Sequence, residues 1–239
     1  MGGDVIQRLR YWRGGYIGLA LTPLVGVLIL LGLTFQFQSP SIEYQRELTA
    51  AVFMLICVAG AILSVYPHGF SKIMKRKSRD EAGEGYLGHH PTCGSFSTHV
   101  LSSQGKTFCS GCLGLALGAF AAIVFTLFSL VFETSFKPEY LLFMGLALTV
   151  VGILQHALDF DKPLLHSALN ASLVLGVGLV RVSVGQLNGG IIVDVYALAI
   201  VLYIILARIE LSQNDHKVIC EACGRTPCTY SYAMESRTS

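Results

Sequence analysis

The stretch from Cys109 to Phe132, CSGCLGLALGAFAAIVFTLFSLVF, decides the fold. From Leu113 onward it is mainly apolar and contains no charged residue. A helix of about 20 mainly apolar residues is long enough to cross the hydrocarbon core of a bilayer. Apolar residues lie on every side of this helix, a pattern typical of a membrane span and not of a helix on a soluble core. The stretch therefore predicts a transmembrane helix that begins directly after a C-x-x-C motif.

Five further stretches have the same character, so the sequence predicts an all-α polytopic membrane protein. The six expected spans are 15–35, 48–66, 113–132, 140–158, 164–185 and 190–209. Only 13% of the 239 residues are charged, against about 25% in soluble domains, and the mean hydropathy is +0.59. These values exclude a conventional soluble domain and a disordered chain. The formal net charge of +2 gives no reason to expect nucleic acid as a partner, and the expected partner is the lipid bilayer.

Four regions follow from these spans: 1–66 with the first two spans, a loop at 67–112, spans three to six at 113–209, and a tail at 210–239. Lysine and arginine are distributed unequally among them. The N-terminal arm, the 67–112 loop, the loop between spans four and five and the tail, counted together with Arg208 at the end of span six, hold fourteen of the 17 basic residues. These segments share one side of a six-span protein, and the positive-inside rule assigns that side to the cytoplasm. We therefore expect a multi-pass cell-membrane protein with both termini cytoplasmic.

The 67–112 loop contains three cysteines and three histidines within a short stretch of sequence. Cytoplasmic thiols are normally reduced, so such a cluster indicates a metal or redox site and not structural disulfides. Zinc needs four nitrogen or sulfur ligands, and the C-x-x-C motif supplies two thiolates at a helix start, where the helix dipole favours them. The predicted ligands are Cys93, His99, Cys109 and Cys112, with His90 and His89 as alternatives to His99.

The tail contains a second cluster with the spacing of a zinc site. Its four candidate ligands are His216, Cys220, Cys223 and Cys228. Each cluster could hold its own ion, or Cys109, Cys112, Cys220 and Cys223 could build one bridged site. Two sites are the preferred arrangement, because each segment already contains four candidate ligands. Zinc is the expected metal, and iron–sulfur ligation is the alternative, since soft thiolates suit both.

The central motif resembles that of an uncharacterised group of small prokaryotic membrane proteins. In that group a cysteine precedes a Cys-Ala-Arg-Cys-Thr-Gly motif at a helix start. Here Ser110-Gly111 replaces Ala-Arg and Leu113 replaces Thr, and the His89-His90 lead-in is not typical of the group. The resemblance implies a membrane metal or thiol site but no substrate. The matching residues are Cys93, Phe96, Gly105, Phe108, Cys109, Cys112, Gly114 and Gly118, and Gln155 and Asn170 correspond to polar positions in the following helices.

Polar residues also occur where spans four and five meet the cytoplasmic side. His156, Asp159 and His166 would lie on the same side as the cysteine loop and could support a metal there as outer-sphere groups, or they could simply contact water and headgroups. On the opposite side, Arg181 and Asp194 are predicted to form a structural ion pair between spans five and six. The small-residue motif at Gly114 and Gly118 is expected to serve packing inside the bundle or dimerisation.

Three functional hypotheses follow. The first is a membrane protein with cytoplasmic Cys/His metal sites in a structural or regulatory role, in which the metal orders segments too short to bury a core. The second is a membrane thiol–disulfide oxidoreductase that uses the C-x-x-C motif. The third is a metal or ion transporter with cytosolic sensing segments. A second copy of the chain or another membrane protein is a further candidate partner.

Overall fold

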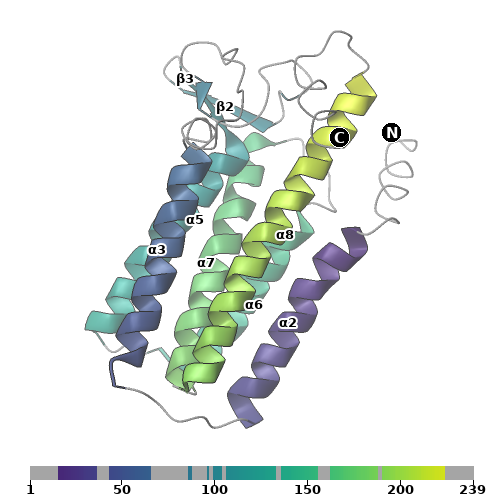
Figure 1. Cartoon of the computed structure of the whole chain (residues 1–239). Coiled ribbons are helices and arrows are strands. Elements are labelled where there is room, and N and C mark those ends of the chain that lie inside the picture. Colours follow the sequence, from purple (N-terminus) through teal and green to yellow (C-terminus); the bar gives the residue numbers. More distant parts are fainter. Residues whose placement is uncertain are drawn as a thin grey trace, which may run out of the picture.

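The computed structural model describes residues 16–36, 43–65, 86–87, 96, 99–103, 106–132, 136–155, 162–187 and 190–223. These residues form six long helices that run alternately up and down in one bundle (Figure 1). A small three-stranded sheet lies at one end of the bundle, beside the start of α5. The helices are α2 (Tyr16–Gln36), α3 (Gln45–Val65), α5 (Ser110–Val131), α6 (Pro138–Leu154), α7 (Pro163–Leu187) and α8 (Ile191–Cys223).

Four of these helices are long and apolar enough to cross a membrane, which indicates a membrane protein. They are α3, α5, α7 and the Ile191–Ser212 part of α8. In α2 and α6 the apolar segments are shorter, Leu21–Gln36 and Pro138–Ile153. Large apolar side chains such as Leu55, Phe120 and Phe143 point outward and are about two-thirds exposed. An exterior of this kind suits contact with lipid and would be unfavourable in water.

The central helix is α7, which α5, α6 and α8 surround, while α2 lies at the edge of the bundle against α8 (Figure 1). Glycines allow the close approach of α5 to α7. A Cβ atom at Gly114 would collide with the carbonyl oxygen of Ser167, and one at Gly118 would lie 2.6 Å from the carbonyl oxygen of Ala171. The small-residue motif therefore serves packing inside the bundle.

The sheet consists of β1 (Tyr86–Leu87), β2 (Val100–Ser103) and β3 (Lys106–Cys109) in the order β1-β3-β2. β2 pairs antiparallel with β3, with Val100 opposite Cys109, and β1 pairs parallel with β3, with Leu87 opposite Phe108. The sequence predicted helices alone, so these strands are an addition to the expected fold. Val100, Thr107 and Phe108 are residue types that favour strands.

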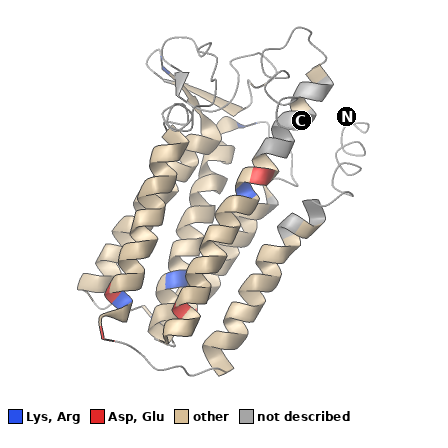
Figure 2. Cartoon of the chain, viewed as in Figure 1, with Lys and Arg blue, Asp and Glu red and all other residues tan. Residues whose placement is uncertain are grey.

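Two helix boundaries also differ from the prediction. The expected fourth span, 140–158, is observed as a helix that ends at Leu154, followed by a turn at Gln155. The expected sixth span ended at Ile209, but α8 continues as far as Cys223. The first part of the predicted 210–239 tail is therefore helical. Charged residues in the helices gather toward the two ends of the bundle, and the long middle sections carry none (Figure 2).

Candidate functional site

The two cysteines of the C-x-x-C motif occupy the junction between β3 and α5. Cys109 is the last residue of β3 and the N-cap of α5, with φ −68° and ψ 122°, and Cys112 lies in the first helical turn. Both side chains are buried. The motif is thus a strand-to-helix junction, and the amide groups of the first helical turn stabilise negative charge there. We call this end of the bundle the cysteine end.

Strand pairing brings His99 to the same junction. Because Val100 lies opposite Cys109 in the hairpin, His99 lies next to Ser110, and the Ser110 hydroxyl donates a 3.0 Å hydrogen bond to the carbonyl oxygen of His99. The imidazole of His99 packs against that of His166 in the first turn of α7, with 4.7 Å between the ring centroids. The expected proximity of His166 to the cysteine loop is therefore observed.

A buried polar network from α6, α7 and α8 lies beneath this junction. Arg208 donates two hydrogen bonds to Asn170 Oδ1, of 3.0 Å from Nε and 2.9 Å from Nη2. Asn170 Nδ2 in turn donates to Gln155 Oε1 at 3.0 Å and to the carbonyl oxygen of His166 at 2.8 Å. Sequence reasoning counted Arg208 only as a marker of topology and missed this role. The available signal was a lone arginine at the end of an otherwise apolar span.

The arginine also approaches the C-x-x-C motif. A Cβ atom on Gly111 would lie 3.0 Å from Arg208 Nη2 and 3.9 Å from Cys109 Sγ. A side chain at position 111 would therefore crowd the guanidinium group, which gives a physical reason for glycine between the two cysteines.

The other predicted ligands are only partly within the described residues. Cys93, His89, His90, Cys228, His156 and Asp159 lie outside them. His216 and Cys220 lie on α8, but their side chains are outside the described part, and the half-buried Cys223 ends that helix. Among the side chains that the structure describes, no three His, Cys, Asp or Glu residues come together as a metal-binding group. The remaining candidate ligands for a site at the cysteine end lie outside the described residues.

At the opposite end, the predicted partners Arg181 and Asp194 belong to one buried network, in which residues of α3 connect them. Arg181 Nη2 donates to Thr49 Oγ1 and, at 3.1 Å, to the carbonyl oxygen of Arg46. Asp194 Oδ2 accepts a 2.7 Å hydrogen bond from Gln45 and lies 3.5 Å from Thr49 Oγ1. The sequence predicted the two charges but not the partners on α3. We call this end the Arg181 end.

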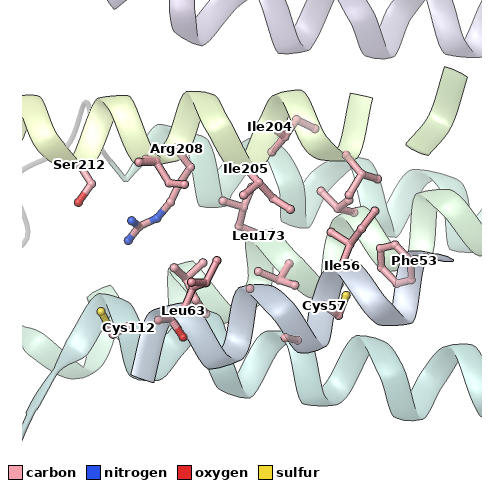
Figure 3. Close-up of a pocket in the computed structure, with 18 residues that line it drawn as sticks. Phe53, Ile56, Cys57, Leu63, Cys112, Leu173, Ile204, Ile205, Arg208 and Ser212 are labelled. Carbon is pink, nitrogen blue, oxygen red and sulfur yellow. The ribbon is translucent and has the colours of Figure 1, made fainter. Parts of the chain in front are cut away.

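Between the two ends lies a cavity of about 270 Å³, bounded by α3, α5, α7 and α8 (Figure 3). Its wall is mostly apolar and includes Cys57, which is buried in α3. Cys112 and Arg208 line the end of the cavity that is nearest the C-x-x-C motif. The cysteine end thus combines a thiol pair, a buried cation and an apolar space.

Comparison with known proteins gives no precedent for this arrangement. No protein-family model, curated protein or solved structure matches the chain. The proposed function below therefore depends on the geometry of the cysteine end.

Proposed function

We propose that the chain is a six-span membrane protein that binds zinc through Cys109 and Cys112 on its cytoplasmic side, in a structural or regulatory role. Cys93 and a histidine, with His99 first and His90 or His89 next, complete the ligand set. The observation that carries the proposal is the junction itself. Two buried thiols sit at a helix N-terminus, and hairpin pairing holds His99 beside them. A tetrahedral zinc site uses ligands of these types.

The sheet register supports the remaining ligands. Leu87, two residues before His89 in the sequence, pairs with Phe108, the residue before Cys109. Strand β1 runs parallel to β3, so the chain leaves β1 in the direction of the C-x-x-C motif. This direction favours a contribution from the segment that contains His89, His90 and Cys93.

The arrangement of the helix ends supports the cytoplasmic orientation. The sheet, the start of α7 and the end of α8 lie at the same end of the bundle (Figure 1). The basic loop and tail segments adjoin these elements, so a six-span protein would hold most of its basic residues on that side. This side is the cytoplasm in the proposed topology, and both termini share it.

Helix geometry favours two metal sites over one bridged site. Ser212 lines the cavity together with Cys112, and α8 continues unbroken from Ser212 to Cys223. At a rise of 1.5 Å per residue, Cys223 lies about 16 Å farther along the axis. Cys220 and Cys223, at helical spacing i and i+3, would therefore bind their ion with His216 or Cys228 and not with Cys109 and Cys112.

Metal analysis of the purified full-length protein tests this proposal. Under reducing conditions the wild type should retain zinc, and Cys93→Ser, Cys109→Ser or Cys112→Ser should each lose the ion of the loop. Cys57→Ser is the matched control, because Cys57 is buried in the middle of α3 and should not affect metal content. Cys220→Ser should remove only the tail's ion. A reduced wild-type protein that binds no metal would refute the proposal. Detection of iron together with inorganic sulfide would show that the thiolates hold an iron–sulfur cluster and not zinc.

A thiol–disulfide oxidoreductase is the second candidate, favoured by one observation. Cys112 lies on the wall of an apolar cavity that could admit a lipophilic oxidant, and the two thiols have the C-x-x-C spacing of redox motifs. In that case the purified protein would hold no metal. Free-thiol titration would show reversible loss of two thiols in the wild type and not in Cys109→Ser.

A further inference from the structure

The cavity beside the C-x-x-C motif opens toward the outside of the bundle between α3 and α8. Its inner wall is made by buried residues of α5 and α7, such as Cys112 and Leu173. On the other side, Leu63 and Ile209 line it and are 43% and 41% exposed, and a Cβ on Gly60 would meet no atom within 4 Å. In a membrane this opening faces lipid, so an occupant enters from the bilayer without passing through water.

The cavity begins at the membrane boundary and extends inward. Ser64 is the second-last residue of α3, and Ser212 is the last residue of the apolar part of α8. From these two residues the cavity follows α3 to Phe53 and α8 to Val201, so Ser212 and Phe53 lie at its opposite ends (Figure 3). Each segment is about 16 Å long at 1.5 Å per residue. This length is about half of a 30 Å hydrocarbon core, the depth that one leaflet contributes.

The volume of the cavity suits one hydrocarbon chain. An apolar cavity of about 150 Å³ in a protein core holds one benzene molecule, so about 270 Å³ has room for about eleven carbon atoms. Spread over about 16 Å, these atoms follow one another at about one for every 1.5 Å, which is single file. An unbranched chain fits such a space. Two chains side by side, a fused ring system or a chain with regular methyl branches needs a wider one.

The polar residues of the wall, Ser64, Arg208 and Ser212, all lie at the boundary end, and the deeper wall is apolar. A chain that enters from the boundary therefore fills the whole depth of the cavity and leaves its headgroup outside, among the headgroups of the leaflet. We propose that the cavity binds one unbranched acyl chain of a phospholipid from the adjacent leaflet, and that it selects this lipid by the shape of the chain and not by the headgroup.

Photo-crosslinking of the full-length protein in liposomes tests this inference. The probes are phosphatidylcholine and phosphatidylglycerol, each with the same diazirine in the middle of one straight chain. Labelling of the two wall segments, 53–64 and 201–212, should saturate at a low fraction of probe and at the same fraction for both headgroups. Labelling of Phe120, which is 68% exposed on α5 and not on the cavity wall, should rise in proportion to the probe.

Competition tests the shape of the chain. An excess of unlabelled phosphatidylcholine with straight chains should abolish the saturable labelling of the wall. The same excess of phosphatidylcholine with methyl-branched phytanoyl chains should leave most of it in place, because the branches do not fit in single file.

A pair of glycine variants locates the chain. Gly60→Leu extends a side chain into the cavity and should lose the saturable labelling of 201–212. Gly32→Leu on α2 is the matched control, because a Cβ there also meets nothing within 4 Å but Gly32 is not on the cavity wall, and it should label as the wild type does. Thermal unfolding and gel filtration would verify that both variants are folded.

Several outcomes would overturn the proposal. They are wall labelling that rises in proportion to the probe as at Phe120, equal effects of Gly60→Leu and Gly32→Leu, and saturation by one headgroup alone. Displacement by branched chains as effective as by straight ones would do the same. A co-purifying isoprenoid quinone or free fatty acid that the phospholipids fail to displace would assign the cavity to that molecule instead. Cys109→Ser removes a proposed zinc ligand but no wall residue and should label as the wild type does, so a failure of the zinc proposal leaves this one intact.

Discussion

Both ends of the bundle contain a buried arginine, but the two arginines have different surroundings. At the Arg181 end, Arg181 belongs to a network with Thr49, Gln45 and the carboxylate of Asp194. At the cysteine end, Arg208 donates two hydrogen bonds to Asn170 and, together with Cys112, lines a cavity of about 270 Å³. The cavity next to Arg181 measures only about 20 Å³, which is room for about one water molecule.

This difference separates an arginine packed among polar side chains from one that lines a cavity. Asp194 supplies the negative charge that Arg181 needs in an apolar bundle, so the Arg181 end holds α3, α7 and α8 together. Asn170 positions Arg208 through two hydrogen bonds, and a cavity adjoins this arginine. A buried charge alone therefore does not identify a functional site, whereas a buried charge beside a cavity and reactive side chains is a stronger indication.

The largest expected effect tests the structural role of the Arg181 end. Asp194→Ala leaves Arg181 without its carboxylate and removes the acceptor of the Gln45 Nε2 hydrogen bond, and should lower the free energy of unfolding by about 3–5 kcal/mol. Arg208→Gln at the cysteine end should cost about 1–3 kcal/mol, because it breaks the two hydrogen bonds to Asn170. Unfolding titrations with a denaturing detergent would measure both. Equal losses would mean that both arginines are structural.

Asp194→Asn sharpens this test. An asparagine retains an oxygen that can accept from Gln45 but removes the negative charge. If the charge matters, this variant should be closer in stability to Asp194→Ala than to the wild type. Wild-type stability in Asp194→Asn would show that hydrogen bonding alone maintains the Arg181 end.

Hydropathy and charge predicted the helices well because these patterns depend on local composition. Every one of the six predicted spans corresponds to a helix, since a long apolar segment in a membrane must satisfy its backbone hydrogen bonds internally. Helix ends were less predictable. The polar residues after Ile209 gave no apolar signal, yet α8 continues through them to Cys223, because helix formation there requires no membrane.

The residue types of the candidate site could be predicted from the sequence, but the contacts between those residues could not. The spacing of Cys109 and Cys112 and the position of His166 at a helix start were evident in the sequence, and the structure brings these three residues to one end. The pairing of Arg208 with Asn170 joins residues far apart in the chain, and Asn170 packs against Gly114, where an added Cβ would lie 2.9 Å from the Asn170 Cβ. No local pattern contains that information. The short strands were missed because each is only two to four residues long.

A second prediction separates the two ends by metal affinity. His166 packs against His99, so His166→Ala should leave a mobile His99 and weaken zinc retention about 10–100-fold while changing stability little. Thr49→Val at the Arg181 end should have the opposite pattern, with lower stability and unchanged metal affinity. Competition with a chelator of known affinity measures the first quantity. Unchanged zinc affinity in His166→Ala would mean that His166 only contacts water and headgroups.

The smallest expected effect comes from two serines that make equivalent hydrogen bonds at opposite ends. Ser110 donates to the carbonyl oxygen of His99 at 3.0 Å, and Ser183 donates to the carbonyl oxygen of Pro138 at 2.6 Å. Each alanine variant removes one buried hydroxyl donor and should lower the free energy of unfolding by about 1 kcal/mol.

Their effects on zinc should differ, because only the Ser110 bond fixes a candidate ligand. Ser110→Ala removes the hydrogen bond that holds the hairpin at His99, so zinc must order that segment when it binds. The binding free energy of zinc should therefore weaken by about 1 kcal/mol, which lowers the affinity about fivefold. Ser183→Ala should bind zinc as the wild type does. Chelator competition on both variants, with unfolding titrations alongside, measures the contrast. The contrary result is that the two variants lose stability equally and neither loses zinc affinity. In that case the hairpin only covers the helix ends, and His90 or His89 is the histidine ligand in place of His99.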